Sequence, residues 1–292
     1  MSEETFISTF RLLLVSLILL IGCDQTFQPL QENNKYYFSI YGYLDAAADT
    51  QWVRIGPARR DINEPPNPSG IEVTLEHVQS GQTVTMNDSL VLSKSFLNYW
   101  TTMDIENEVT YRIKVERADE KSSSVTITTP KEVPTPLVIE SEGYFDIFIN
   151  DSVGKPVDIQ AKWYVIVDPF GIRQKRVYTF PLRHKIKHSE AYGGTFYLTI
   201  DANRQLEEIR KNNGGNMSVA HRQFFVAAGG PEWDETITSI DDLEYFLDVT
   251  TSNVENGLGY MIGIDSKRVP LATCLTPDRT NVEPCPPEKP FW

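Results

Sequence analysis

The chain has 292 residues, 40% of them hydrophobic and 23% charged, and this length predicts about two domains that each bury a core. The formal net charge is −13, and so acidic a surface repels phosphate backbones and anionic lipid, which argues against nucleic-acid binding. Solubility is the simpler explanation of the acidity.

An apolar run of ten residues occupies positions 12–21. It is too short to span a bilayer comfortably and matches the apolar region of a signal peptide. Gly22 and Cys23 follow it directly, and this ending resembles the bacterial lipobox, in which a small residue precedes the cysteine that takes up diacylglycerol. The sequence therefore predicts a signal peptide over 1–22, cleavage before Cys23, lipidation of Cys23 and attachment to the outer membrane. An uncleaved anchor or an ordinary signal peptide is the alternative.

Residues 23–35 are polar and lack periodicity, which is typical of a short tether between the lipid and the first domain. Besides Cys23, the chain contains Cys274 and Cys285 near its C-terminus. Because an exported chain meets an oxidising compartment, this even pair predicts a Cys274–Cys285 disulfide. A metal site is the alternative, although no histidine lies in either flank.

Short strand patterns recur over 36–130, where apolar residues alternate with polar or aromatic ones and no helical period is present. Ser80-Gly81 separates two of these patterns and predicts a hairpin with glycine in the turn. A long loop rich in proline and asparagine is expected at 57–70. Seven or eight short strands without a helix indicate an antiparallel β-sandwich.

Tyr111 opens one of these strands, and Ile105 lies six residues before it. The spacing resembles the tyrosine corner of fibronectin type III and immunoglobulin-like sandwiches, in which the phenol bonds to the chain upstream. A plain cross-strand aromatic is the alternative.

Three prolines at 130–136 predict a domain boundary, because this stretch cannot feed a central strand. Residues 137–269 combine strand patterns with two short helices, one capped by Asp201 and reaching Asn212, the other beginning at Ser239. Residues 270–292 form a proline-rich tail. The expected fold is thus mainly β: an immunoglobulin or fibronectin III-like antiparallel sandwich, then a β-rich domain with two short helices.

The sequence contains no Gly-x-Ser-x-Gly, no His-Glu-x-x-His, no phosphate loop and no dinucleotide fingerprint. We therefore expect no catalysis, no cofactor and no metal centre. An acidic stretch at 232–248 offers oxygens that calcium uses, but its spacing differs from that of an EF-hand loop. Calcium binding there is left open.

Four tryptophans, Trp52, Trp100, Trp163 and Trp233, would stack on sugars if they were exposed, although aromatic residues of sandwiches more often pack in the core. The stretch that leads to Trp233 contains Gly229, Gly230 and Pro231, which indicate a rigid turn. The sequence predicts that this turn presents Trp233 at a loop tip, with Gly229 and Gly230 as part of a candidate binding site.

Several of these features stand in a distinctive order. A lipobox and tether lead to Phe38-Ser39-Ile40-Tyr41-Gly42, a Thr-Pro-Lys-x-Val-Pro motif follows at 129–134, and Ser252-Asn253-Val254-Glu255-Asn256-Gly257-Leu258-Gly259-Tyr260 stands near the end. This order resembles the domain of unknown function 4249 (DUF4249) lipoproteins of Bacteroidota. The resemblance implies an envelope lipoprotein, often encoded near TonB-dependent transporters, and it implies no catalytic residues.

The function predicted from sequence is that of a lipid-anchored envelope protein that binds a ligand or assists a partner, with a TonB-dependent receptor as the candidate partner. Two alternatives belong to other classes. One is an envelope hydrolase that uses a glycosidase-like carboxylate pair, which leaves no reliable mark in sequence. The other is a purely structural envelope component.

Overall fold

The computed structural model describes the following residues: 36–57, 70–89, 97–119, 121–150, 156–167, 173–190, 194–213, 217–234, 237, 240, 252–271 and the backbone of 274–275 and 282–283. Strands dominate these ranges, which contain one α-helix and one 3-10 turn. The expectation of a mainly β fold is confirmed. The signal peptide, tether, loop 58–69 and all but one residue of the helix expected from Ser239 lie outside the described residues.

Eight strands come from the first part of the chain: β1 (Phe38–Asp45), β2 (Gln51–Pro57), β3 (Ile71–His77), β4 (Gln82–Thr85), β5 (Asn87–Ser89), β6 (Leu97–Thr101), β7 (Thr110–Arg117) and β8 (Ser122–Thr128). The later elements are β9 (Leu137–Ser141), β10 (Tyr144–Asn150), β11 (Pro156–Val167), β12 (Gln174–Pro181), η3 (Arg183–Lys185), β13 (Lys187–Ser189), β14 (Thr195–Asp201), α2 (Ala202–Asn212), β15 (Met217–Gly229), β16 (Gly257–Pro270), β17 (Cys274–Leu275) and β18 (Val282–Glu283).

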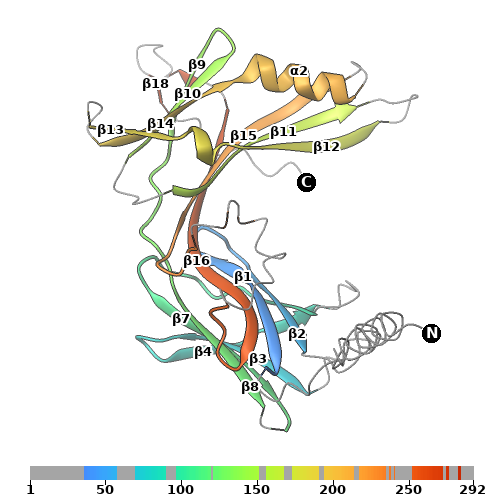
Figure 1. The fold of residues 1–292 in the computed structure, drawn as a ribbon, viewed down its shortest axis with the longest axis vertical. Coiled ribbons are helices and arrows are strands. Elements are labelled where there is room, and N and C mark those ends of the chain that lie inside the picture. Colours follow the sequence, from blue (N-terminus) through green and yellow to red (C-terminus); the bar gives the residue numbers. More distant parts are fainter. Residues whose placement is uncertain are drawn as a thin grey trace, which may run out of the picture.

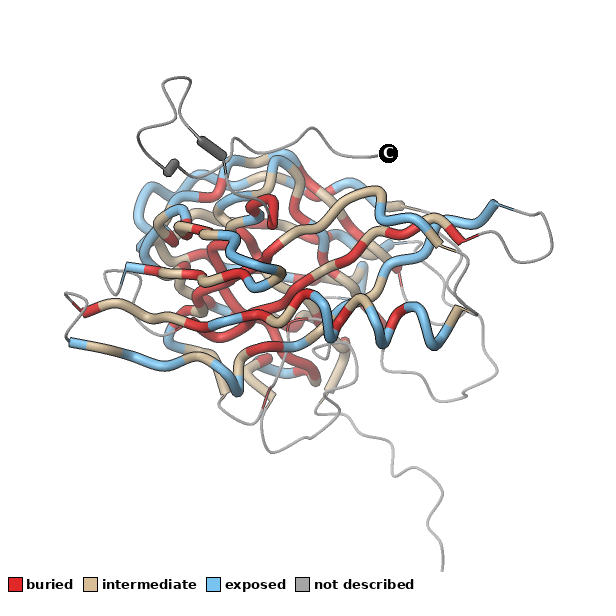
Figure 2. Tube along the Cα trace, turned by 90° about the horizontal axis from the view of Figure 1, so that it is seen from above, coloured by how far each residue is buried: buried red, intermediate tan, exposed pale blue. Residues whose placement is uncertain are grey.

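One long sheet runs through both lobes of the molecule, in the order β12-β11-β15-β16-β1-β2-β6-β5 (Figure 1). A four-stranded sheet, β4-β3-β7-β8, covers one half of it and forms the first lobe. A second four-stranded sheet, β13-β14-β10-β9, covers the other half together with α2 and forms the second lobe. Buried segments run between the layers, and exposed ones lie outside them (Figure 2).

The first lobe has the sandwich that the alternating sequence predicts. Alternate residues of β7 point inward, because successive side chains of a strand face opposite sides of the sheet. Gly81, with φ of 71°, makes the predicted turn between β3 and β4, and its N–H donates to the His77 carbonyl. The fully buried core side chains include Phe38, Ile40, Leu44, Ile55, Leu75, Ile113 and Ile127.

The strand β16 belongs to both lobes, which the sequence did not reveal. Its first half pairs in parallel with β1, from Phe38↔Gly257 to Asp45↔Ile264. Its second half pairs antiparallel with β15, up to Gln223↔Pro270. The first lobe is therefore not purely antiparallel, because β16, a strand from near the end of the sequence, pairs in parallel with β1. The boundary expected at 130–136 remains a prediction, and the first sandwich also takes residues from beyond it.

The second lobe contains the helix that the sequence predicts from Asp201. The Asp201 side chain accepts a hydrogen bond from the N–H of Arg204 at 2.9 Å and so caps α2, while Ile209 is buried. Gln205 faces inward as well, and its side-chain oxygen accepts from the indole N–H of Trp163 at 2.7 Å. Helix α2 is thereby tied to β11 across the core.

The proline-rich connection between the lobes packs against the end of β15 and the middle of β16, which pair side by side. A Cβ on Gly230 would lie 1.9 Å from the carbonyl oxygen of Thr128, so only glycine permits this approach. The N–H of Val133 donates to Asp265 at 2.6 Å, and the side chain of Val133 enters the core of the second lobe. Burial raises the pKa of the Asp265 carboxyl. The connection is thus held by hydrogen bonds and close packing.

Tyr111 forms the corner that its spacing predicts. Its side chain is buried, and its hydroxyl accepts a hydrogen bond from the backbone N–H of Glu106 at 2.8 Å. Burial also raises the pKa of the phenol, which therefore stays protonated at neutral pH. The corner ties the segment before β7 to the core.

Replacing Tyr111 by phenylalanine should lower the free energy of unfolding by about 1–2 kcal/mol, because it leaves the Glu106 N–H without its acceptor and the ring in place. Urea denaturation of both proteins measures this difference. Tyr144→Phe is the matched control, since the Tyr144 side chain is 45% exposed on β10 and its loss of hydroxyl should change stability by less than about 0.5 kcal/mol. Equal losses for the two variants would contradict the role of the corner.

Candidate functional site

The outer face of the long sheet carries two rows of side chains in the first lobe. In one row, Tyr41 of β1 pairs with Arg54 of β2, which pairs with Asn98 of β6. In the next row, Tyr43 pairs with Trp52, which pairs with Trp100. The inward neighbours of these residues, such as Val53 and Ile55, fill the core, so strand alternation turns the aromatic and polar groups outward.

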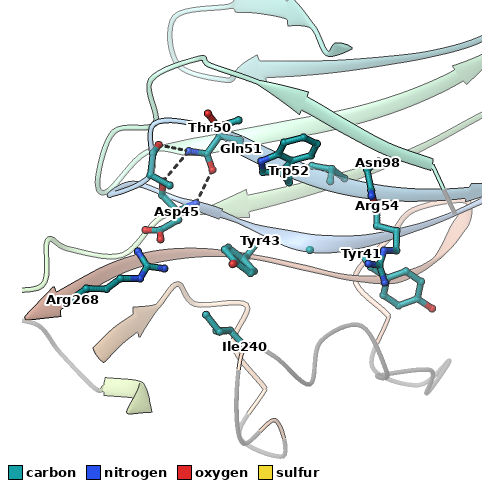
Figure 3. Close-up of a pocket in the computed structure, with 13 residues that line it drawn as sticks. Tyr41, Tyr43, Asp45, Thr50, Gln51, Trp52, Arg54, Asn98, Ile240 and Arg268 are labelled. Carbon is teal, nitrogen blue, oxygen red and sulfur yellow. Dashed lines mark hydrogen bonds between the residues drawn. The ribbon is translucent and has the colours of Figure 1, made fainter. Parts of the chain in front are cut away.

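A pocket of about 490 Å³ opens on this face (Figure 3). This volume is in the range of small-ligand sites, which are about 300–1,000 Å³. Its walls come from β1, β2, β6 and β16 and from Ile240. We call it the Trp52 pocket, and its lining includes Tyr41, Tyr43, Asp45, Gln51, Trp52, Arg54, Asn98 and Arg268.

The aromatic part of the Trp52 pocket combines an exposed ring with more buried ones. Trp52 is 48% exposed, and its ring centroid lies 6.2 Å from that of Trp100 at an interplanar angle of 35°. Tyr41 is buried, which raises the pKa of its phenol. Trp52 therefore offers a flat apolar surface to solvent, and Tyr41 remains a neutral phenol at physiological pH.

One end of the pocket is fixed by a network around Asp45. Its Oδ2 accepts from the Ser266 hydroxyl at 2.6 Å, and its Oδ1 accepts from the N–H groups of Ser266 and Ala47 at 3.1 and 3.0 Å. The Gln51 side chain bonds to the backbone N–H and carbonyl of Asp45, both at 2.9 Å (Figure 3). These bonds stiffen the turn between β1 and β2, so the carboxylate serves as a structural acceptor.

Cationic groups lie on the same outer face. Figure 3 places Arg268 at one end of the pocket and Arg54 toward the other, with Tyr43 between them. The Arg268 guanidinium lies 5.1 Å from the ring centroid of Phe225, and Lys162 lies 5.2 Å from the same centroid. Asp45 is the only carboxylate among the described residues that line the pocket.

The turn at 229–233, which we predicted from the sequence to be a binding loop, lies at the end of β15, where the two lobes meet. A Cβ on Gly229 would lie 3.1 Å from both the Trp233 Cβ and the methyl groups of Val157, so this glycine allows a close approach. The Gly230 N–H donates to the carbonyl of Gly263 at 2.8 Å. Both glycines therefore have a structural role, because they allow the close packing at the end of β15 beside β16.

Trp233 differs from the expectation of an exposed loop tip. Its ring is partly buried against a cluster that includes Tyr260 and Ile262, and the Arg183 guanidinium lies 5.8 Å from its centroid. Its indole Nε1 is buried without a hydrogen-bond partner among the described residues. Trp233 thus packs over the outer face of β16, and a binding role for it stays a prediction. The exposed tryptophan of the described chain is Trp52.

Several residues named from sequence cannot be placed. Gly22, Cys23 and Cys285 lie outside the described residues, as does the side chain of Cys274, so the lipid anchor and the disulfide stay predictions. Of the acidic residues in the stretch 232–248, Glu232 and Asp234 are described. The Oε1 of Glu232 accepts from the N–H of Thr128 at 2.9 Å, and burial raises the pKa of its carboxyl. The N–H of Asp234 donates to the Tyr260 hydroxyl at 2.8 Å.

The described part of the chain contains neither a metal-binding cluster nor a membrane-spanning helix. Within those ranges, no group of three or more histidine, cysteine, aspartate or glutamate side chains could hold a metal ion. No helix in the same ranges is long and apolar enough to cross a membrane.

Sequence reasoning missed Tyr41, Tyr43, Arg54 and Arg268 as site residues. A signal was available for the first three, because Tyr41 and Tyr43 occupy alternate positions of one strand and Trp52 and Arg54 those of the next. Large aromatic groups on the face opposite the core are the expected mark of a binding surface. Arg268 had no such signal, since its position beside the pocket depends on β16 lying next to β1 in the sheet.

Comparison with known proteins adds little beyond the fold. No protein-family model and no curated protein matches the chain. Among solved structures, a DUF4785 family protein from Legionella pneumophila is 12% identical with a TM-score of 0.25, and the match covers 65% of this chain and 52% of that one. The chain thus spans about half of that protein.

Immunoglobulin and fibronectin structures are matched as well. The IG1 and IG2 domains of DIP-gamma are 8% identical with a TM-score of 0.22, and 81% of this chain and 97% of that one are covered. The FN1–FN3 domains of chicken CNTN1 are 9% identical with a TM-score of 0.20, over 79% and 64% of the two chains. These likenesses concern the sandwich architecture alone.

Proposed function

We propose that this chain is a lipid-anchored outer-membrane lipoprotein that binds saccharide in the Trp52 pocket and does not catalyse. The exposed face of Trp52 carries the proposal, because aromatic rings stack on the apolar faces of sugars. Arg54 and Asn98 line the pocket beside it and carry hydrogen-bonding groups of the kind that sugar hydroxyls need. A rigid sheet holds all of these groups, which favours recognition.

A binding role fits the pocket better than hydrolysis does. A glycosidase needs two carboxyl groups on opposite sides of the scissile bond. Asp45 has no second carboxylate beside it among the described lining residues, and its oxygens already accept hydrogen bonds from Ser266 and Ala47. The protein would gather its ligand at the envelope, next to a TonB-dependent transporter, as the resemblance to DUF4249 lipoproteins implies.

The binding site is tested with a Trp52→Ala variant. Calorimetric titration with neutral and acidic oligosaccharides should show about tenfold weaker binding, which corresponds to about 1.4 kcal/mol, because the stacking surface is lost. The unfolding temperature should stay close to that of the wild type, since Trp52 is 48% exposed. Tyr144→Ala removes another aromatic side chain of similar exposure, 45%, and should leave affinity unchanged. Equal affinity of Trp52→Ala and wild type would overturn the site.

The anchor is tested with a Cys23→Ala variant. In a bacterial host fed an alkyne fatty acid, the wild type should be labelled and should sediment with membranes. The variant should lack the label and remain uncleaved or soluble, because the thiol that takes up diacylglycerol is gone. A variant that is processed and membrane-bound like the wild type would show that the chain is not a lipoprotein.

A further inference from the structure

The charge of the Trp52 pocket is opposite to that of the protein as a whole. The chain carries a formal net charge of −13. Yet among the described residues that line the pocket, the charged ones are Arg54, Arg268 and one carboxylate, Asp45, whose oxygens accept hydrogen bonds from neighbouring groups. A local excess of cations in an acidic protein favours an anionic ligand at this site.

Arg268 is well placed to bind such a ligand. Its side chain is exposed, and it forms no hydrogen bond or ion pair with the described residues. It leans over the Phe225 ring at 5.1 Å, and this contact holds the guanidinium in place. A guanidinium presents two parallel N–H donors that match the two oxygens of a carboxylate.

The cationic surface continues from the pocket into the second lobe. Phe225 of β15 pairs with Arg268 of β16, and Lys162 of the next strand, β11, lies 5.2 Å from the Phe225 ring centroid. The β11 partner of Phe225 is Gln160, so Lys162 stands two residues further along that strand and reaches the Phe225 ring diagonally. The two cations beside this ring extend the positive surface beyond the pocket, which suits a chain of several sugars better than a single one.

We propose that the ligand of the Trp52 pocket is an acidic oligosaccharide, in which a sugar ring stacks on Trp52 and uronate carboxylates pair with Arg268 and Arg54. The inference rests on the proposed saccharide-binding function and names its ligand class. Uronates combine the apolar sugar face that a tryptophan needs with the carboxylate that a guanidinium needs. No bond is made or broken in this binding.

The test uses the full-length protein in non-ionic detergent and calorimetric titration. The probes are oligogalacturonate, oligomannuronate, oligoguluronate and a glucuronate-containing oligosaccharide, each paired with its carboxyl-reduced, neutral form. At least one acidic probe should bind ten times or more tighter than its neutral partner. Added salt should weaken the binding of the acidic probe and leave the binding of the neutral one unchanged, because salt screens the attraction between charges.

Variants of Arg268 show whether this residue causes the preference. In Arg268→Ala and Arg268→Gln, the affinity for the acidic probe should fall to within about threefold of the affinity for its neutral form. Arg268→Lys should keep part of the preference, because it keeps the positive charge. Lys211→Ala is the control: it removes one positive charge from an exposed position on α2 and should leave both affinities unchanged. Unfolding temperatures identify any variant that fails to fold, and the glutamine variant then replaces the alanine one.

The outcomes separate this inference from the proposed function. Equal affinity for acidic and neutral probes, with both weakened by Trp52→Ala, would overturn the acidic ligand and keep the saccharide site. A preference for acidic probes that survives in every Arg268 variant would also overturn the role of Arg268. If no probe binds, the proposed function itself falls, and the inference falls with it.

Discussion

A Gly259→Ala variant is expected to lose more than about 4 kcal/mol of folding stability, the range reserved for severe backbone or core defects. Gly259 lies in β16 with φ of 121°, where side chains are rarely tolerated. A Cβ there would lie 2.0 Å from the carbonyl oxygen of Ile40 and 2.9 Å from its nitrogen. Because both are backbone atoms of the paired strand β1, the variant can only relax by separating the two strands.

Guanidinium denaturation of wild type and variant measures this loss. Gly81→Ala is the matched control, because Gly81 also has a positive φ, of 71°, but a Cβ there meets nothing within 4 Å. It should therefore lose only the conformational penalty, about 1–2 kcal/mol. If Gly259→Ala were no less stable than Gly81→Ala, the close parallel pairing of β1 and β16 would be wrong.

The isolated fragment 30–130 is expected not to fold, although it holds all eight strands of the first sandwich before β16. Removal of β16 exposes the edge of β1 along its whole length, from Phe38 to Asp45. It also removes Val254 and Met261, which both belong to the core of the first lobe. Circular dichroism and amide-proton dispersion in NMR spectra should show an unfolded chain.

A rescued fragment supplies the control for this experiment. Residues 252–265 joined behind residue 130 through a flexible glycine-serine linker of about 15 residues restore the strand that pairs with β1. This construction should unfold cooperatively, with a defined midpoint in urea. Cooperative unfolding of 30–130 without the added strand would instead show that the first sandwich is independent, as its proline-rich exit at 130–136 suggests in the sequence.

Local elements of this fold could be predicted from the sequence because their causes are local. The hairpin at Gly81, the cap at Asp201 and the corner at Tyr111 each depend on residues a few positions apart. The sharing of β16 could not be predicted in this way, because strand periodicity does not name the partner. One hint was the nearly continuous apolar run around Ile262, which is typical of a strand buried on both faces.

The binding site shows the same division. The glycines before Trp233 correctly indicated a tight turn, but the sequence could not tell that Tyr260 and Ile262 lie beneath the ring. Exposure depends on which residues pack against a side chain, and here those residues come from β16, the strand that both lobes share. Trp52 stands on β2, which β1 separates from β16 in the sheet, and its side chain is 48% exposed.

The sharing of β16 also determines when β1 can find its partner during synthesis. β1 leaves the ribosome near the start of synthesis, whereas its partner at 257–264 leaves near the end. Because synthesis proceeds at about 5–20 residues per second, roughly ten to forty seconds pass between the synthesis of β1 and that of its partner. Throughout this interval, one edge of β1 presents unpaired N–H and carbonyl groups, a template for pairing with other chains.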